Sequence, residues 1–433
     1  MPTLPAPVRP LAVLIAAALL TTSCVGGSSE RSGEGTGSER STSDPVTVEP
    51  DAPSDDPLSW GPTEAELFEA QEVVASMSAA ELAGQVIVGR WHGSDPATAA
   101  GMVEELHLAG VQLTGDNIVD RTQVTATTAA VTEASESTGR SFPPVIGVDQ
   151  EGGVVAHLRG ITAEFPSFAT AGTAVAKNGD AGRRTVRAAM RANALELREL
   201  GFTWVFAPVA DVTIGEADVT IGSRSPSSDP DVAAATVSAA VEGYVDAGIV
   251  STTKHFPGHG AATQDSHETL PEIDVSRQEL ETRELPPFQA AVRAGAPAVM
   301  LGHLDVSSLA PGVPTSLAPE AYDLLRGDLG FEGVAITDSL GMGAVTSRDR
   351  PAVEALAAGA DLLLMPADTP HTHRVVTRAI SRGDLSRERV EEAAARVVAV
   401  QLWQQRVSTE LAVPADATER AAAAAQEMVA AAS

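Results

Sequence analysis

The stretch IVSTTKHFPGHGAATQDSH, residues 249–267, joins a β-branched apolar run to a dense group of polar side chains. The run at 249–253 has the composition of a buried strand. Pro257, Gly258 and Gly260 exclude a regular helix or strand beyond that point. We therefore predict a buried strand followed by a glycine-rich loop that carries lysine, histidine and aspartate side chains. Loops on a rigid scaffold often hold functional groups, and the alternative is a surface loop with scattered histidines.

Similar apolar runs recur along the chain, and several of the intervals between them have helical spacing. The eight runs lie at residues 86–88, 111–113, 145–148, 205–206, 249–253, 298–301, 334–336 and 362–365. Strands that alternate with helices predict an α/β protein with a parallel sheet. A closed (β/α)8 TIM-type barrel explains the number eight best. An open doubly wound sheet is the alternative, although no GxGxxG motif follows the first runs.

Composition narrows the class of protein. The chain has 433 residues, of which 43% are hydrophobic, so it can fill a sizeable core. Its formal net charge of -29 argues against nucleic acid or an anionic membrane surface as a partner, because both would be repelled. With a single cysteine, Cys24, no disulfide can form within the chain.

The first residues have the features of a secretion signal. Arg9 precedes an apolar run at 11–20 that is too short to span a membrane, which indicates a signal peptide. Cys24 follows small residues, as in the lipobox of bacterial lipoproteins. Polar residues rich in Gly, Ser and Pro follow, and they predict a flexible tether. The predicted organisation is a signal peptide at 1–24 with a lipidated Cys24, a tether at 25–57, one barrel domain at 58–408 and an Ala-rich tail at 409–433.

This organisation places the protein outside the cytoplasm, anchored to the bacterial membrane only by the lipid on Cys24. The alternative is a secreted protein in which Cys24 is incidental.

Polar side chains gather just after the apolar runs. In a parallel barrel, these positions share the rim where active sites are built. The candidate site residues at this rim are Asp149, Arg224, Lys254, His255, Asp265, His267 and Asp338.

These residue types suit acid–base and nucleophilic chemistry on a polyhydroxylated ligand. Asp338 directly follows a run, and a rigidly held carboxylate there suits a nucleophile or a charge stabiliser. Asp265 and His267 could form a carboxylate–imidazole pair that acts as a general acid and base. The other four candidates would supply donors and acceptors for hydroxyl groups. The structural alternatives are that Asp338 caps the next helix and that Asp149 braces the turn at 152–153.

Three histidines, His255, His259 and His267, lie close together in the sequence, as the ligands of a metal site often do. Pro257 and Gly258 break the helix that an HExxH zinc site needs, and no glutamate follows His255. We therefore predict neither a metal nor a cofactor.

The motifs KHFPGHG at 254–260, DSH at 265–267, VDQEGG at 148–153 and ITDSL at 336–340 resemble glycoside hydrolase family 3. More narrowly, they resemble its bacterial β-N-acetylglucosaminidase branch, in a lipoprotein form. The resemblance covers about residues 60–405. It implies a (β/α)8 barrel and an exo-enzyme that removes terminal β-linked N-acetylglucosamine from cell-wall muropeptides during peptidoglycan turnover.

The resemblance also implies roles for the candidate residues. Asp338 would be the nucleophile that forms a covalent glycosyl-enzyme, and His267 would be the acid/base, assisted by Asp265; the outcome would be retention. The remaining candidates, Asp149, Arg224, Lys254 and His255, would bind the terminal sugar. The family often has an arginine eight residues after the Asp149 position. Here His157 stands there and Arg159 is the nearest arginine, so substrate contact at this position stays open.

Other functions fit the same sequence. One is a β-glucosidase or an N-acetylglucosaminide phosphorylase on the same fold. Another is a sugar-binding lipoprotein without catalysis, against which the intact set of Asp265, His267 and Asp338 argues. The expected partner is a carbohydrate substrate, and the expected state is a monomer.

Overall fold

The computed structural model describes residues 53–218, 220–262, 264–266 and 268–433. The predicted signal peptide, Cys24, most of the tether and His267 lie outside the described residues. Within the described part, no helix is both long and apolar enough to cross a membrane.

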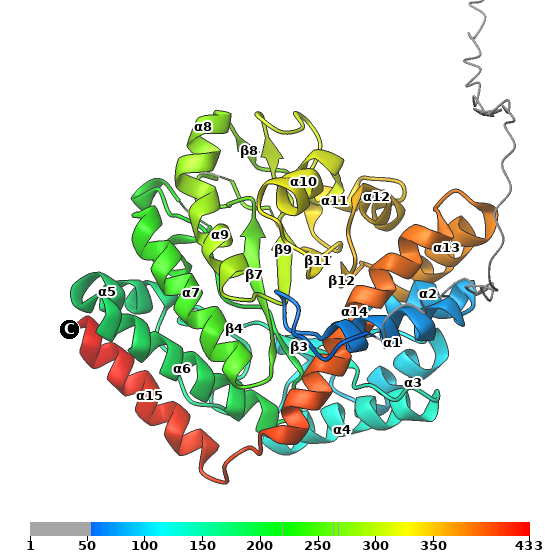
Figure 1. Cartoon of the computed structure of the whole chain (residues 1–433), viewed down its shortest axis with the longest axis horizontal. Helices are drawn as coiled ribbons and strands as arrows, with labels where there is room; N and C mark the ends of the chain where they lie inside the picture. Colours follow the sequence, from blue (N-terminus) through cyan, green and yellow to red (C-terminus); the bar gives the residue numbers. More distant parts are fainter. Residues whose placement is uncertain (1–52, 219, 263, 267) are drawn as a thin grey trace, which may run out of the picture. The chain divides into compact units, whose positions relative to one another are not determined.

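Eight parallel strands form a closed barrel (Figure 1). In ring order they are β11 (Val334–Thr337), β9 (Ala298–Leu301), β7 (Val250–Phe256), β6 (Trp204–Val205), β3 (Val145–Val148), β2 (Gly110–Leu113), β1 (Ile87–Gly89) and β12 (Leu363–Leu364). The ring closes between β11 and β12, where the Thr337 amide donates to the Leu362 carbonyl at 3.0 Å. This closure confirms the predicted (β/α)8 barrel and excludes the open sheet.

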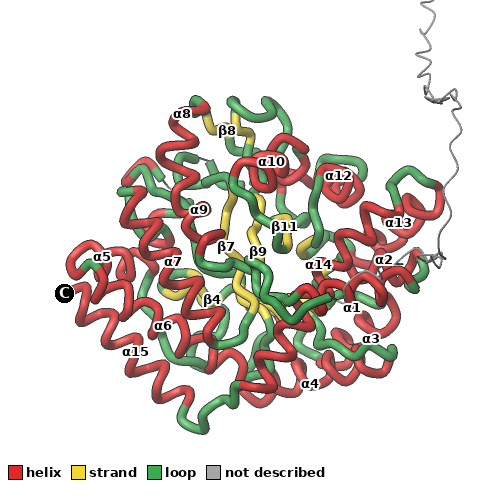
Figure 2. The backbone as a smooth tube through the Cα atoms, in the orientation of Figure 1, coloured by secondary structure: helices red, strands yellow, loops and turns green. Residues whose placement is uncertain are grey.

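The strands form the inner layer, and helices surround them (Figure 2). The helices are α1 (Glu64–Ala75), α2 (Ala79–Gln85), α3 (Pro96–Leu106), α4 (Arg121–Ser137), α5 (Phe168–Asn178), α6 (Asp180–Glu199), α7 (Pro230–Asp246), α8 (Arg277–Glu279), α9 (Leu285–Arg293), α10 (Pro319–Asp323), α11 (Gly343–Thr346), α12 (Pro351–Ala358), α13 (Thr369–Arg382), α14 (Arg387–Glu410) and α15 (Ala417–Ala432). Two π-helical turns are η4 (Leu280–Glu284) and η6 (Leu324–Asp328).

Short elements complete the fold. Four small strands lie outside the barrel: β4 (Gln150–Gly152), β5 (Val155–Ala156), β8 (Glu272–Ile273) and β10 (Asp305–Val306). The single 3₁₀ turns are η1 (Gly115–Asn117), η2 (Gly215–Ala217), η3 (Gly222–Arg224) and η5 (Thr315–Leu317).

Capping residues that can be recognised in the sequence mark the first turns of several helices. Ser78 and Glu81 form a reciprocal capping box at the start of α2. Asp229 caps α7, and Pro230 occupies its first position, as the Asp-Pro pair predicts.

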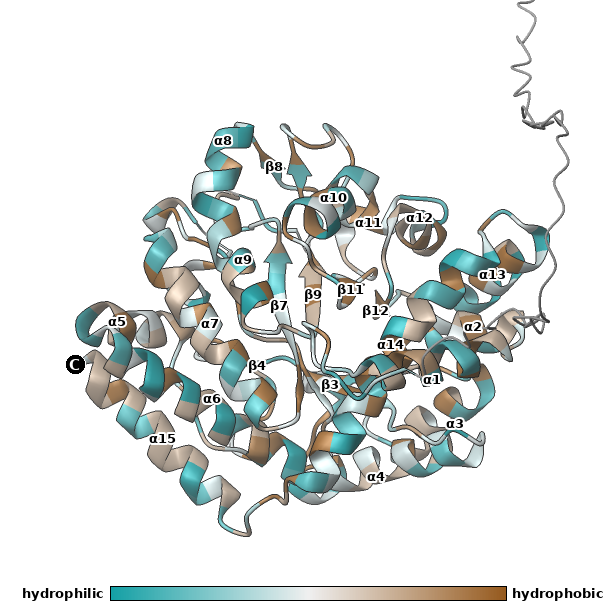
Figure 3. Ribbon diagram, viewed as in Figure 1, coloured by the Kyte–Doolittle hydropathy of each residue, from teal (hydrophilic) through white to brown (hydrophobic). Residues whose placement is uncertain are grey.

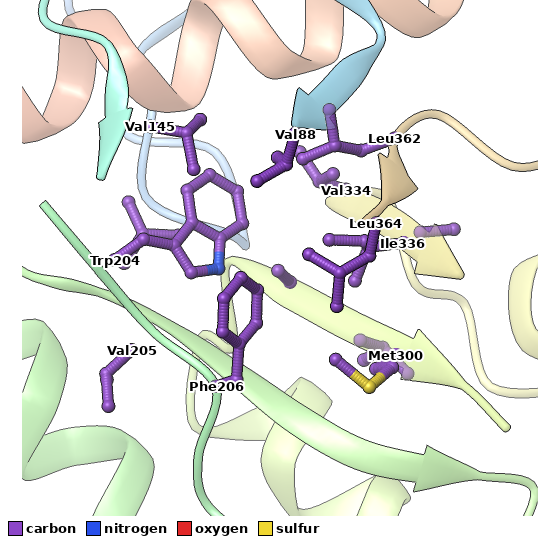
Figure 4. Close-up of a cluster of buried hydrophobic side chains, with 14 of the residues drawn as sticks. Val88, Val145, Trp204, Val205, Phe206, Met300, Val334, Ile336, Leu362 and Leu364 are labelled. Atoms are coloured by element: carbon purple, nitrogen blue, oxygen red, sulfur yellow. The ribbon is translucent and has the colours of Figure 1, made fainter. Parts of the chain in front are cut away.

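The barrel interior is filled by large apolar side chains. Figure 4 shows side chains from several strands converging there, among them Val88, Trp204, Phe206 and Leu364, and each of these four is almost completely buried. The buried indole of Trp204 donates from Nε1 to Thr252 Oγ1 at 2.6 Å, which satisfies its one polar atom. Hydropathy follows this arrangement: β9 is hydrophobic along its length, whereas the carboxyl end of β7 is hydrophilic (Figure 3).

The strand β7 is longer than the apolar run that predicted it. It continues through Phe256, which pairs with Leu301 of β9 after an irregularity in the ladder. Lys254 and His255 therefore belong to the end of a strand and not to the following loop. The backbone hydrogen bonds of this strand hold both side chains more rigidly than a loop would.

A buried charge cluster lies at the amino-terminal side of the barrel. Asp361, just before β12, is fully buried and forms ion pairs with Arg326, Arg389 and Arg396. It also accepts a hydrogen bond from the Ala335 amide at 2.9 Å. Burial alone would raise the pKa of Asp361, but the three guanidinium groups outweigh burial and lower it. The cluster joins η6, α14 and two strands.

The helix α15 packs against α5 and α6 (Figure 1). Its buried residues Ala417, Ala421, Ala425 and Met428 recur at helical spacing and form one face. Lys177, in the last turn of α5, donates to the carbonyl of Ala432 at 2.9 Å. Small alanine side chains allow this close helix packing.

Candidate active site

A cavity of about 440 Å³ opens at the carboxyl ends of the barrel strands. It is lined by Asp149, Arg224, Lys254, His255 and Asp338, which the fold brings together from positions far apart in the sequence. A larger cavity of about 660 Å³ lies between α1, α14 and η6. Active sites of (β/α)8 barrels lie at the carboxyl ends of the strands, so the smaller cavity is the candidate active site.

A buried ion-pair cluster forms one wall of this cavity. Lys254, with a side chain only 3% exposed, pairs with Asp149 and lies 2.7 Å from a carboxylate oxygen of Glu151. Arg224 binds the same Glu151 through two hydrogen bonds of 2.8 Å. Burial alone would raise the pKa of Glu151, but Lys254 and Arg224 lower it to about 2. Glu151 is therefore ionised, and it fixes both cations in place.

Glu151 was not among the predicted site residues. It stands two positions after Asp149, in the same short motif that follows the strand β3. Its side chain is almost completely buried. Its place beside Asp149 at the predicted rim was a usable signal, because the two predicted cations need carboxylate partners if they are buried.

His255 is oriented by a second residue that the prediction missed. The ring Nδ1 of His255 lies 2.7 Å from Asp211 Oδ2, and Asp211 also accepts hydrogen bonds from the amides of His255 and His259. Asp211 is fully buried. Burial alone would raise its pKa, but the attraction of His255 outweighs burial and lowers it. The bond to Nδ1 leaves the Nε2 atom of His255 facing Arg224 across 3.4 Å.

His259, in the loop after β7, donates from its amide to Asp211 and so holds the start of this loop. The buried ring of His259 contacts Ser266 Oγ through Nε2 at 3.1 Å. Ser266 lies between Asp265, whose side chain is exposed, and His267, which lies outside the described residues. Gly258 has a φ of +134°, and a Cβ atom there would lie 2.4 Å from Glu284 Oε2. Only glycine therefore fits at this turn.

Asp338 lies at the end of β11 and lines the cavity. Its amide donates to the Leu301 carbonyl at 2.9 Å, and its Oδ1 accepts from the Ser339 amide at 2.7 Å. Burial alone would raise the pKa of Asp338, but His255 and His303 outweigh burial and lower it. Its carboxylate is therefore ionised at neutral pH, which is the form that a nucleophile or a charge stabiliser requires.

The two structural alternatives for the carboxylates are wrong. The helix α11 begins at Gly343 after Met342, so Asp338 does not cap it. The Asp149 carboxylate accepts hydrogen bonds from Gln112 and Lys254, so it faces the cavity and not the glycine turn.

His303 braces the segment after Asp338. This fully buried ring contacts Ser316 Oγ through Nδ1 at 2.6 Å and the Ser339 carbonyl through Nε2 at 3.0 Å. The second contact requires a proton on Nε2. His303 thus fixes the backbone next to Asp338.

Three basic residues near the rim differ in their surroundings. His157 lines the cavity, whereas the guanidinium of Arg159 donates to the Gly153 carbonyl. Arg90, at the end of β1, also lines the cavity and was not predicted. Among the described residues, no group of three or more His, Cys, Asp or Glu side chains is arranged to hold a metal.

Comparison with known proteins agrees with this geometry. The model of the glycosyl hydrolase family 3 N-terminal domain matches residues 74–400. The curated β-hexosaminidase LpqI of Mycobacterium tuberculosis is 32% identical over 406 residues, which cover 90% of this chain and 96% of the relative.

Solved structures show the same relationship. A family 3 β-N-acetylglucosaminidase from Paenibacillus sp. superposes with a TM-score of 0.75 at 28% identity, covering 82% of this chain and 68% of the other. The structure of M. tuberculosis LpqI superposes with a TM-score of 0.69 at 30% identity, covering 77% and 96%. The chain therefore belongs to glycoside hydrolase family 3, in the branch of bacterial β-N-acetylglucosaminidases, and it is a glycoside hydrolase.

Proposed function

We propose that this enzyme is a retaining exo-β-N-acetylglucosaminidase in which Asp338 is the nucleophile and His267 is the acid/base. The observation that carries the proposal is the placement of the ionised Asp338 in the same cavity as the cluster of Asp149, Lys254 and Arg224. That cluster presents charged hydrogen-bond groups at fixed positions, which suits the hydroxyl groups of one terminal sugar.

The reaction takes place in two steps. In the first, the Asp338 carboxylate attacks the anomeric carbon while His267 donates a proton to the glycosidic oxygen, so the bond to the leaving alcohol breaks. In the second, His267 takes a proton from a water molecule that attacks the same carbon, and the ester bond to Asp338 breaks. Two inversions give net retention.

Asp265 would assist His267 as its carboxylate partner. The contact between His259 and Ser266 supports this proposal, because both residues line the cavity and the His259 amide also donates to Asp211. A histidine acid/base also adds no second negative charge beside Asp338.

The proposed substrates are cell-wall muropeptides with a terminal β-linked N-acetylglucosamine. The mycobacterial relative is named a β-hexosaminidase, which supports the sugar. The short apolar run at 11–20 and Cys24 support a lipoprotein that acts outside the cytoplasmic membrane. Residues 58–408 would form the catalytic domain of a monomer.

Two aryl glycosides and phosphate test the function. We expect release of the aryl alcohol from the β-N-acetylglucosaminide at a much higher kcat/KM than from the β-glucoside, with no dependence on phosphate. Faster cleavage of the glucoside would assign a β-glucosidase, and formation of a sugar 1-phosphate would assign a phosphorylase. No turnover of either substrate by the folded protein would indicate a sugar-binding lipoprotein.

Replacement of His267 by alanine tests the acid/base role. We expect kcat/KM to fall about 10²- to 10⁴-fold for an aryl glycoside with a poor leaving group, because that alcohol must be protonated as it departs. For an activated aryl group, the loss in kcat/KM should be much smaller. A control, His371→Ala, removes an exposed histidine on α13 and should change neither rate. Equal losses on both substrates would show that His267 is not the general acid.

A further inference from the structure

Glu284 is a buried carboxylate that the proposed mechanism does not use. It ends the π-helical turn η4, directly before α9, and its side chain is only 1% exposed. Such π-helical turns are rare and often occur at functional sites. The described residues that line the active-site cavity do not include Glu284, so its burial needs another explanation.

The side chain of Glu284 lies against the backbone of the turn after β7. Four residues later on the same helical face, the ring of Phe288 packs edge-to-face on Phe256 of β7, with ring centroids 5.2 Å apart. Two residues after Phe256, a Cβ atom on Gly258 would lie 2.4 Å from Glu284 Oε2 and 2.8 Å from Glu284 Cβ. The packing of α9 on β7 therefore places the carboxyl group of Glu284 directly against Gly258.

Gly258 is connected to the loop that carries the Asp-Ser-His motif. The next residue, His259, donates from its amide to Asp211 at 2.8 Å, and its ring contacts Ser266 Oγ at 3.1 Å. Ser266 directly precedes His267 in the sequence. A shift of the turn at Gly258 would therefore be passed on to the residue beside the proposed acid/base.

The two carboxyl oxygens of Glu284 have different surroundings. Oε1 accepts hydrogen bonds from the guanidinium of Arg283, one of them from Nε at 2.8 Å. Oε2 is buried and has no hydrogen-bond partner among the described residues. A negative charge on a buried oxygen without a donor is costly, so a proton is favoured there. Burial raises the pKa of Glu284 to about 7, against the opposing effect of Arg283.

Two further carboxylates disfavour the ionisation of Glu284. Asp211 and Asp218, in the segment after β6, both raise its pKa. The pKa of His259 is lowered chiefly by burial, so its ring brings no positive charge at neutral pH, and His255 is already paired with Asp211. The remaining charged side chains of η4 and of the neighbouring helices α7, α8 and α9 are exposed or paired elsewhere, and they are Asp231, Glu242, Asp246, Arg277, Glu279, Glu281 and Arg293.

We propose that Glu284 is a positioning residue for the loop after β7: its protonated carboxyl group packs against Gly258 and holds the loop, and loss of the proton displaces the loop and slows catalysis. This rests on the proposed function of His267. An ionised Oε2 needs a donor, and the space between Oε2 and Gly258 does not admit even a methyl carbon. Water can therefore solvate the charge from this side only if the turn moves away. The proton itself is released to the solvent.

Glu284→Gln tests the proposal through a pH profile. Glutamine has the shape of the protonated acid and stays neutral at every pH. With an aryl N-acetylglucosaminide that has a poor leaving group, we expect the variant and the wild type to have similar kcat/KM at about pH 6. At about pH 8, the variant should exceed the wild type about 10-fold. The reason is that the neutral fraction of a group with a pKa of about 7 falls about tenfold for each pH unit above that value.

Glu281→Gln is the matched control. Glu281 lies in the same π-helical turn, but its side chain is 53% exposed and pairs with Arg277. This variant should follow the wild type at both pH values. Parallel profiles for the wild type and Glu284→Gln, or an equal loss in Glu284→Gln at both pH values, would overturn the proposal, because a purely structural role does not depend on this proton.

Thermal unfolding shows independently whether Glu284 holds a proton in the folded protein. Its pKa is raised from 4.5 to about 7 on folding. The stability contributed by this proton is therefore fully present below pH 4.5 and is lost as the pH rises through about 7. Relative to Glu284→Gln, the unfolding midpoint of the wild type should fall over this interval and change little above it. A difference that is constant with pH would overturn the proposal.

Hydrogen exchange examines the loop in the wild type and needs no variant. After correction for the intrinsic effect of pH on exchange, the amides of Gly258 and His259 should be less protected at about pH 8 than at about pH 6. Equal protection at the two pH values would contradict a displacement of the turn and overturn the proposal.

A double variant shows whether Glu284 acts through the acid/base. In His267→Ala, the additional change Glu284→Gln should no longer raise kcat/KM at about pH 8, because no acid/base is left to position. If the advantage of about 10-fold persisted in that background, the proposal would be wrong. Equal losses for His267→Ala on poor and activated leaving groups would instead refute the proposed function, which is a separate result.

Discussion

Asp338→Ala is expected to lower kcat/KM for an aryl N-acetylglucosaminide by at least about 10⁴-fold, as in other enzymes that lose their nucleophile. The reason is that no other described carboxylate in the cavity is unpaired: Asp149 and Glu151 are both bound to Lys254. The fold should survive, because the backbone of Asp338 is held by Leu301 and its side chain faces the cavity. Steady-state kinetics and the thermal unfolding midpoint measure both effects.

Added azide gives a further test of whether Asp338 is the nucleophile. In Asp338→Ala, azide can occupy the vacated space and attack the anomeric carbon as the aryl group leaves, which gives the inverted α-glycosyl azide. We expect azide to restore part of the activity of Asp338→Ala through this α-glycosyl azide. His267→Ala should not form the α-glycosyl azide, because Asp338 still occupies that face of the sugar. The control Asp384→Ala removes a carboxylate outside the cavity and should retain full activity. Normal activity of Asp338→Ala would refute the mechanism.

Asp361→Ala is expected to lower the free energy of unfolding by about 3–5 kcal/mol, the usual cost of removing one partner from a buried ion pair. The change leaves Arg326, Arg389 and Arg396 without their shared carboxylate. It also leaves the Ala335 amide without its acceptor. Urea unfolding at neutral pH measures the loss.

The stabilisation by Asp361 should depend on pH in a predictable direction. The pKa of Asp361 is lower in the folded than in the unfolded protein, so its contribution is present above the unfolded value of 3.8. The contribution is lost as the pH falls through the lower folded value. Asp361→Ala should therefore differ less from wild type in strong acid than at pH 7. The control Glu392→Ala removes a half-exposed partner of Arg396 and should cost about 1 kcal/mol or less. If Asp361→Ala lowered the free energy of unfolding by no more than Glu392→Ala does, the cluster around Asp361 would not stabilise the barrel.

The strand positions could be predicted from sequence because each strand is buried on both faces. Such strands form continuous apolar runs, and all eight predicted runs correspond to barrel strands. The prediction failed at the end of β7, where Lys254 and His255 interrupt the apolar run although the strand continues. Burial of these polar residues depends on Asp149, Glu151 and Asp211, which lie in segments that follow other barrel strands.

Prediction of the site residues from sequence was limited in the same way, because contacts between distant residues could not be foreseen. Residues in short motifs, such as Asp149 and Asp338, could be placed at the rim by counting from the strand ends. The contacts of Asp211 and Arg90 could not be predicted in this way, because they are made with residues of other strands and loops. Asp211 reaches His255 only because the segment after β6 stays paired with Lys254 of β7. Arg90 lines the cavity beside Gly341, where a Cβ atom would lie 2.7 Å from Arg90 Nη1.

In the proposed mechanism, Asp338 forms a covalent glycosyl-enzyme in a retaining reaction. The most direct test is the anomeric configuration of the first N-acetylglucosamine released by the wild-type enzyme, followed by proton NMR before mutarotation equilibrates the anomers. A double displacement through Asp338 gives the β-anomer first. Initial appearance of the α-anomer would mean a single displacement by water, and it would contradict the nucleophilic role of Asp338.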